Sequence, residues 1–209
     1  IFDFMRALIT DADEIVIRST DGKTDLRTFL YDADEYDAVV ASGGDGTISC
    51  VAYELADTAI PLLPFPAGTA NLLATNLCSP TEPYGIADMM RNFTTMDFDI
   101  GELILSDGSK HGFTIMAGAG YDATIMKDAE DGKKLLGQMA YFTSALSNAT
   151  PQFSRLNLIL DGKPIESSGV GILIINFSKI QFDISVVHEN KPRDGLFDVV
   201  IFNTKDAYG

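Results

Sequence analysis

The chain has 209 residues, of which 46% are hydrophobic, and its 15 basic against 30 acidic residues give a net charge of −15. This composition is typical of a globular protein with enough apolar residues for one large domain or two small ones. The acidic excess argues against nucleic acid as a partner and against broad electrostatic adhesion to anionic membranes, because both need basic patches.

The first half of the chain alternates strand and helix patterns. Strands are expected over residues 14–18, 37–41 and 60–65, and helices over 24–31, 47–57, 70–77 and a stretch ending near residue 91. Strands that alternate with helices predict a parallel sheet with right-handed crossovers.

The second half changes character near Met96. Strands are expected over residues 98–105, 110–116, 153–160, 170–177 and 196–202, joined by turns such as 106–109 and 161–163. Only residues 134–146 are expected to be helical there. We therefore predict an α/β domain over residues 1–96 and a mostly antiparallel β domain over 97–209, with the ligand site in the cleft between them.

The most informative segment runs from Ser42 to Thr47 with the sequence SGGDGT. It leaves a predicted buried strand and opens a helix, which places free backbone N–H groups at the sheet edge where phosphates bind. Glycines let a phosphate approach without a Cβ in the way. Asp45 would repel a bare phosphate, so we assign it an electrostatic role beside Mg²⁺. Taken alone, the segment also fits a plain strand-to-helix turn.

A second loop, PFPAGTAN from Pro64 to Asn71, also leaves a strand and enters a helix. Thr69 can cap that helix or donate its hydroxyl to a phosphate oxygen, and Asn71 can bridge neighbouring loops. Two such loops at one sheet edge can hold a triphosphate from two sides.

Together, GGDGT at residues 43–47 and PAGTANLLATNL at 66–77 resemble the diacylglycerol kinase catalytic family. Further similarity lies in FDIG at 98–101, AGAGYD at 117–122 and RDGLFD at 193–198. GGDGT alone is shared with NAD kinases, whereas the Gly-Thr-Ala-Asn continuation is typical of the lipid branch.

The resemblance implies a Rossmann-like α/β ATP domain of the NAD kinase and diacylglycerol kinase type, followed by a β-sandwich lipid domain. The residues implied in ATP contact are Thr20, Gly43, Gly44, Asp45, Gly46, Thr47, Ile48, Ser49, Gly68, Thr69 and Asn71. Asp194 is implied in Mg²⁺ binding, with the backbone carbonyls of Lys191 and Leu196. One carboxylate and two carbonyls suit a hard cation.

The chain also departs from the family pattern. It lacks the usual Asn-Pro-x-x-Gly loop of the first strand and the late Asp-Gly-Glu segment, whose carboxylate takes the proton of the lipid hydroxyl. We therefore expect both ends, and the general base, to lie outside this sequence. Leu72 stands where many members carry a second Asp after Asn71, so a magnesium network built on that Asp cannot form here in the same way.

The function expected is that of an ATP-dependent kinase of a lipid hydroxyl, most simply diacylglycerol to phosphatidic acid, with ATP and Mg²⁺. Two alternatives stay open: a soluble kinase of the NAD kinase type, and a non-catalytic nucleotide- or lipid-binding module. The partners expected are the lipid, a transiently contacted membrane surface and, as an option, a second copy of the chain in a homodimer. No membrane span or signal peptide is visible, so we expect a cytoplasmic protein peripheral to the membrane.

Overall fold

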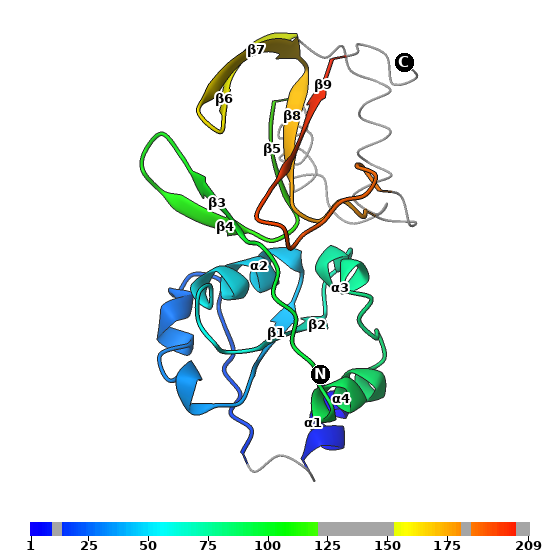
Figure 1. The fold of residues 1–209 in the computed structure, drawn as a ribbon. Helices are drawn as coiled ribbons and strands as arrows, with labels where there is room; N and C mark the ends of the chain where they lie inside the picture. The colour runs from blue at the N-terminus through cyan, green and yellow to red at the C-terminus, as the bar shows by residue number, and fades with distance from the viewer. Residues whose placement is uncertain (10–13, 121–152, 181–184, 204–209) are drawn as a thin grey trace.

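The computed structural model describes residues 1–9, 14–120, 153–180 and 185–203. It confirms the predicted fold class, because an α/β part is followed along the chain by a part made of antiparallel strands, which lies above it in Figure 1. The helix predicted over residues 134–146 lies outside the described residues.

In the described residues of the α/β part, two parallel strands form the sheet: β1 (Val39–Gly43) and β2 (Leu62–Pro66), paired from Val39 with Leu62 to Gly43 with Pro66. Helical elements surround this pair: α1 (Phe2–Leu8), η1 (Leu26–Phe29), η2 (Ala33–Glu35), α2 (Asp45–Glu54), α3 (Leu72–Asn76) and α4 (Pro83–Arg91). Both strands run in the same direction, so the loops that follow them emerge at the same edge (Figure 1).

The helix predicted after the first glycine loop is confirmed as α2. Its predicted apolar face is also confirmed, since Ile48, Val51, Ala52 and Leu55 are all buried. These residues recur at helical spacing, so one face of α2 packs on the core while the other meets solvent.

Two predictions in this half need correction. Residues 14–18 form no strand, because no strand in the described part of the chain pairs with them. Residues 24–31 form only the short 3-10 turn η1 in place of the predicted helix. Asp25 explains part of this difference, because its side chain accepts a hydrogen bond from the N–H of Arg27 and closes a tight local turn.

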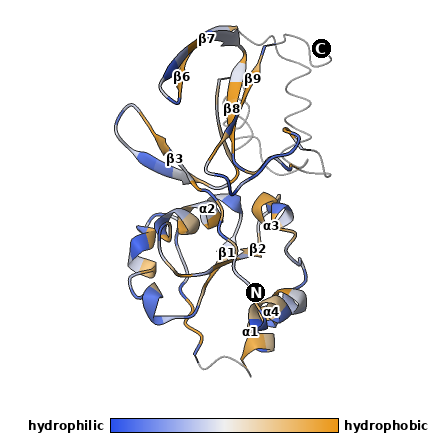
Figure 2. Cartoon of the chain, in the orientation of Figure 1, coloured by the Kyte–Doolittle hydropathy of each residue, from blue (hydrophilic) through white to orange (hydrophobic). Residues whose placement is uncertain are grey.

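Among its described residues, the β part contains two hairpins and one three-stranded sheet. The hairpins are β3 (Gly101–Ile104) with β4 (Lys110–Phe113) and β6 (Ser154–Leu160) with β7 (Lys163–Gly169). The sheet has the order β5 (Met116–Gly120), β8 (Gly171–Ile175) and β9 (Asp198–Phe202), all antiparallel to their neighbours. Hydrophobic residues run along β8 and β9 (Figure 2).

The sequence pattern did not predict the β7 strand. Its sequence, KPIESSG, is polar and almost entirely exposed, so it shows no apolar alternation. The predicted turn before it is confirmed, because Asp161 and Gly162 have φ of 48° and 77°. A turn with two positive φ values is the favoured hairpin connection, and it sets the register of β6 and β7.

The two parts share one apolar core. Ile48 of α2 and Leu73 of α3 belong to the same buried cluster as Ile115 and Phe177 of the β part. Burial of large apolar side chains is the main source of folding energy. The seam between the parts is therefore a packed interface that fixes the glycine loops against the β part.

Candidate active site

The two glycine loops touch each other. The N–H of Ala67 donates to the carbonyl of Gly43 at 3.0 Å, which continues the β1–β2 ladder into the loops. A Cβ built on Gly68 would lie 2.5 Å from the Cα of Gly44. Only a residue without a side chain permits this approach. The predicted neighbourhood of the two loops is confirmed.

The four glycines of the loops are not alike. A Cβ on Gly43 would lie 2.7 Å from the Cβ of Thr47, so Gly43, like Gly68, is required by packing. A Cβ on Gly44 would make only an ordinary contact of 3.6 Å with the Cα of Gly68. A Cβ on Gly46 would meet nothing within 4 Å. The missing side chain at Gly46 thus leaves open space beside the start of α2.

The start of α2 has no capping side chain within the described part of the chain. Its N-cap is Gly44, and Gly46 and Thr47 in the first turn are exposed. The first N–H groups of a helix have no partner inside the helix and lie at the positive end of its dipole. This arrangement suits an anion, above all a phosphate.

Asp45 has a role that the sequence did not reveal. Its Oδ1 accepts a hydrogen bond from the N–H of Leu73 at 3.0 Å, across 28 residues of sequence. Leu73 lies in the first turn of α3, so the carboxylate of Asp45 satisfies one of the free donors of that helix. Asp45 links the two loops through this hydrogen bond, and the residue is only half-buried.

Asn71 closes the second loop on itself. It has φ of 49°, its Oδ1 accepts the N–H of Gly68 at 2.8 Å, and its Nδ2 donates to the carbonyl of Gly68 at 3.0 Å. The predicted bridge between neighbouring loops is therefore wrong, because both amide contacts stay within this loop. Thr69 is exposed, and the N–H of Leu73 at the start of α3 is capped by Asp45 in place of Thr69.

Two predicted contact residues have other partners. Ile48 is fully buried and its N–H donates to the carbonyl of Gly44 at 3.1 Å, so it belongs to the core. Ser49 faces the β part, with its Oγ 2.6 Å from the Oγ1 of Thr114. No sequence pattern pointed to Thr114, which is polar yet fully buried.

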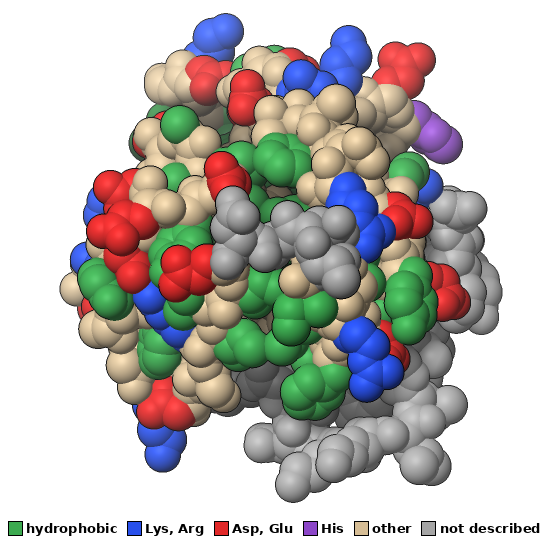
Figure 3. All heavy atoms as spheres, turned by 90° about the horizontal axis from the view of Figure 1, so that it is seen from below, with side chains coloured by type: hydrophobic (Ala, Val, Ile, Leu, Met, Phe, Trp, Pro, Cys, Tyr) green, Lys and Arg blue, Asp and Glu red, His purple; other side chains and the backbone are tan. Residues whose placement is uncertain are grey.

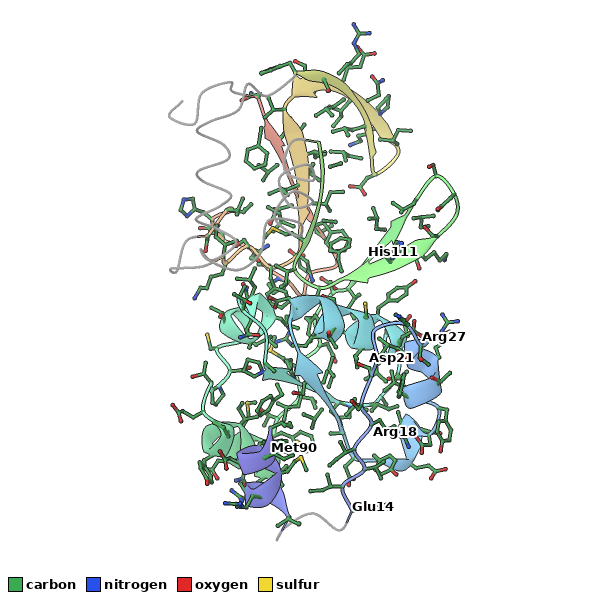
Figure 4. The ribbon with its side chains drawn as sticks, turned by 180° about the vertical axis from the view of Figure 1, so that it is seen from behind. Glu14, Arg18, Asp21, Arg27, Met90 and His111 are labelled. Carbon is green, nitrogen blue, oxygen red and sulfur yellow. The ribbon has the colours of Figure 1, made fainter. Side chains whose placement is uncertain are left out.

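A cavity of about 550 Å³ lies next to the first loop, between residues 14–20 and β1. Thr20 and Thr47 are among the hydroxyl-bearing residues that line it, whereas most of the wall is apolar. Seen from below, hydrophobic side chains gather in the middle of this face, among acidic and basic ones (Figure 3). In Figure 4, Glu14 and Arg18 lie across from Met90 of α4, and all three line the cavity.

An ion pair holds one wall of this cavity. The guanidinium of Arg18 donates to both carboxylate oxygens of Asp32 at 2.5 and 2.6 Å and to the carbonyl of Phe29 at 2.6 Å. The hydrogen bond from Arg18 lowers the pKa of Asp32, although partial desolvation acts in the opposite direction. Arg18 thereby ties residues 14–20, including the region of Thr20, to the helical turns of the α/β part.

A second polar cluster joins α2 to the β3–β4 hairpin. The hydroxyl of Tyr53 donates to Glu102, which also pairs with Lys110 at 3.1 Å. The hydrogen bond from Tyr53, and then that from Lys110, lowers the pKa of Glu102. Gly112 lies beneath Tyr53, since a Cβ there would come within 2.3 Å of the Tyr53 side chain.

The predicted magnesium residues lie in a turn at the base of the β part. Oδ1 of Asp194 accepts the N–H of Leu196 at 3.1 Å, and Gly195, with φ of 75°, donates its N–H to Oδ2 of Asp99 at 2.8 Å. No cluster of three His, Cys, Asp or Glu side chains suited to a metal occurs among the described residues. A metal here would depend on backbone carbonyls, as the predicted set of Asp194, Lys191 and Leu196 does.

The fold and these loops define a class of protein: an α/β part with two glycine loops at one edge of its parallel strands, packed against a β part. Family comparison agrees with this description. Residues 2–103 match the model of the diacylglycerol kinase catalytic domain, and residues 115–207 match the YegS C-terminal NAD kinase beta sandwich-like domain. Residues 2–103 thus belong to the diacylglycerol kinase catalytic-domain family, and residues 115–207 to the matching beta sandwich-like family.

Individual relatives point the same way. The chain is 34% identical over 132 residues to a diacylglycerol kinase of Mycobacterium tuberculosis (strain ATCC 25618 / H37Rv), covering 60% of this chain and 41% of the relative. It is 29% identical over 174 residues to a diacylglycerol kinase of Bacillus subtilis (strain 168), covering 80% and 55%. The chain thus spans about half, or less, of these curated relatives.

The fold also matches a solved structure. A crystal structure of a diacylglycerol kinase from Bacillus anthracis str. Sterne superposes with a TM-score of 0.74 at 20% identity, covering 97% of this chain and 67% of that one. At this identity the match shows the fold. Among the helices that the structure describes, none is long and apolar enough to span a bilayer.

Proposed function

We propose that this chain carries the nucleotide-binding loops and part of the acceptor domain of an ATP-dependent lipid kinase, whose preferred reaction converts diacylglycerol to phosphatidic acid. The observation that carries the proposal is the uncapped start of α2, pressed against the second glycine loop through Gly44 and Gly68. Family membership and the names of the relatives support the choice of a lipid hydroxyl as acceptor.

The phosphates of ATP would lie at the first turn of α2. The open space at Gly46 admits an oxygen close to the backbone, and the exposed Thr47 adds a hydroxyl. The N–H groups of Ala67 and Gly68 are already used within the fold. The second loop therefore offers the phosphates few free backbone donors. Its contribution is close packing against the first loop and the hydroxyl of the exposed Thr69.

Asp45 would lie beside a Mg²⁺ ion bound with the triphosphate, and such an ion would supply positive charge against the charge that develops in phosphoryl transfer. A carboxylate on the edge of a phosphate site fits a cation, because alone it would repel the phosphates. A structural Mg²⁺ is proposed at Asp194 with the carbonyls of Lys191 and Leu196. In both places the chemistry of the donors supports the proposal.

The experiment is ATP-dependent phosphorylation of a lipid panel in mixed micelles by the full-length protein. The panel contains diacylglycerol, sphingosine and ceramide, with aqueous NAD as a separate arm. We expect transfer to diacylglycerol above the other lipids and none to NAD. Transfer to NAD alone would replace the proposal by a soluble kinase, and MgATP binding without any transfer would replace it by a binding module.

A further inference from the structure

The side-chain amide of Asn76, at the end of α3, makes three hydrogen bonds. Its Nδ2 donates to the carbonyls of Leu72 and Lys179, both at 2.8 Å, and its Oδ1 accepts the N–H of Lys179 at 3.2 Å. These contacts use both donors and the acceptor oxygen of the amide. Leu72 begins α3, whereas Lys179 lies in the β part, 103 residues after Asn76.

The other end of α3 is fixed to the phosphate loops. Oδ1 of Asp45 holds the N–H of Leu73, and Asn71 closes the second loop immediately before the helix. The helix has only five residues, so it is about 7.5 Å long. So short an element passes a displacement at Asn76 directly to the second glycine loop.

The contact network continues into the β part. Beside Lys179, the N–H of Ser178 donates to Oδ1 of Asn190 at 3.1 Å, and Nδ2 of Asn190 donates to Oδ2 of Asp198 at 3.0 Å. This brings the network to the turn that holds Asp194. A second link starts from α2, where Ser49 meets Thr114 at 2.6 Å. Both helices that begin at a glycine loop are thus tied to the β part by side-chain hydrogen bonds, α3 through Asn76 and α2 through Ser49 and Tyr53.

We propose that Asn76 is a positioning residue for phosphoryl transfer: it sets the distance between the second glycine loop and the acceptor-binding β part. The proposal rests on the proposed function, because it supposes that the nucleotide lies at the loops and the acceptor in the β part. Transfer depends steeply on the distance between the reacting groups, whereas binding of either one alone does not. We call the hydrogen bonds between Asn76 and Lys179 the clamp. Loss of the clamp therefore slows transfer and leaves the affinity for the nucleotide unchanged.

The test compares wild type, Asn76→Ala and the control Asn157→Ala in the full-length protein. Asn157 is an exposed asparagine of β6, away from the seam. Measured are steady-state lipid phosphorylation, MgATP affinity by calorimetry and hydrogen exchange of the Lys179 amide by NMR. For Asn76→Ala we expect kcat to fall by about tenfold or more, with unchanged MgATP affinity and KM.

The exchange measurement tests the clamp independently of activity. Removing the acceptor of the Lys179 N–H should speed its exchange by about fivefold, the effect of one net hydrogen bond. Asn157→Ala should match wild type in all three measurements. Unchanged kcat in Asn76→Ala would overturn the positioning role, and so would a parallel loss of MgATP affinity, which would make Asn76 merely structural.

Failure of the proposed kinase function can be told apart from failure of the positioning role. If the wild-type protein phosphorylates no lipid, the role in transfer falls with the function. The clamp itself is then decided by the Lys179 exchange and by the distance between spin labels at Glu35 and Ser168, both exposed, after serine replaces Cys50 and Cys78. A wider distance distribution in Asn76→Ala supports the clamp, and an identical distribution with unchanged exchange overturns it.

Discussion

Oδ1 of Asp45, in the first turn of α2, accepts a hydrogen bond from the N–H of Leu73 in α3 at 3.0 Å. One carboxylate therefore caps the helix after the second glycine loop while it lies in the helix after the first. The capping role needs an acceptor oxygen on this side chain, whereas the proposed role at Mg²⁺ needs its negative charge. Variants that retain only one of these properties can separate them.

Asp45→Asn should retain the cap, since its amide oxygen still accepts the Leu73 N–H, but it removes the charge. We expect an unchanged free energy of unfolding and a transfer rate reduced by about a hundredfold or more. Asp45→Ala should lose both the cap and the charge, and its free energy of unfolding should be lower by about 1 kcal/mol. Urea unfolding and the lipid kinase assay measure the two effects, and full activity in Asp45→Asn would confine Asp45 to capping.

Gly46 and Gly68 should respond oppositely to alanine. At Gly46 a Cβ meets open space, so Gly46→Ala should stabilise α2 by up to about 1 kcal/mol. The same Cβ would occupy the proposed phosphate space, and we expect MgATP affinity to fall by about tenfold, the worth of one charge-assisted hydrogen bond. Thermal unfolding and calorimetry check both, and unchanged affinity would place the phosphates elsewhere.

Gly68→Ala brings a Cβ to 2.5 Å from the Cα of Gly44. Because backbone atoms lie on both sides, the loops must move apart, and we expect a loss of about 1–3 kcal/mol in the free energy of unfolding. Urea denaturation measures this loss. A Gly68→Ala protein as stable as wild type would mean that the loops do not meet as described.

The Arg18–Asp32 pair should make stability depend on pH in the acidic range. Because Arg18 lowers the pKa of Asp32 in the folded protein, the pair stabilises the fold above the ordinary carboxyl pKa of 3.8. This stabilisation is lost as the pH falls through the lowered value. The difference in free energy of unfolding between wild type and Asp32→Asn should be constant near neutral pH and vanish in acid.

The measurement is a series of urea unfolding curves across that pH range, with Asp34→Asn as the control. Asp34 is an exposed carboxylate in the same 3-10 turn region. We expect the control to differ little from wild type at any pH. A wild-type advantage over Asp32→Asn that persists in acid would contradict the assigned ion pair.

Asp194→Asn tests the proposed structural Mg²⁺ without disturbing the turn. Asparagine can still accept the N–H of Leu196, so the free energy of unfolding without metal should be unchanged. Mg²⁺ binding, measured by calorimetry in the absence of nucleotide, should weaken. The control is Asp161→Asn, another aspartate before a glycine in a turn, and equal isotherms for all three proteins would remove the site.

The amino-acid sequence alone determined the local elements of this protein and its family. The apolar spacing in α2, the strands that precede both glycine loops and the Asp161–Gly162 turn are signals within about ten residues, and the structure confirmed each. Prediction failed where a strong local signal had no pairing partner in the fold, and where a strand carried no local signal. The strand expected over residues 14–18 has no ladder partner in the described structure, and β7 had no apolar alternation.

The contacts of the polar side chains between the two parts follow from the folded arrangement and from no local pattern. Asp45 meets Leu73 across 28 residues, Ser49 meets Thr114 across 65, and Asn76 meets Lys179 across 103. Hydrogen bonds have strict distance and angle requirements, whereas sequence patterns report burial and periodicity. The partner of each polar group therefore becomes defined only when packing of the apolar core has placed the two parts of the chain against each other.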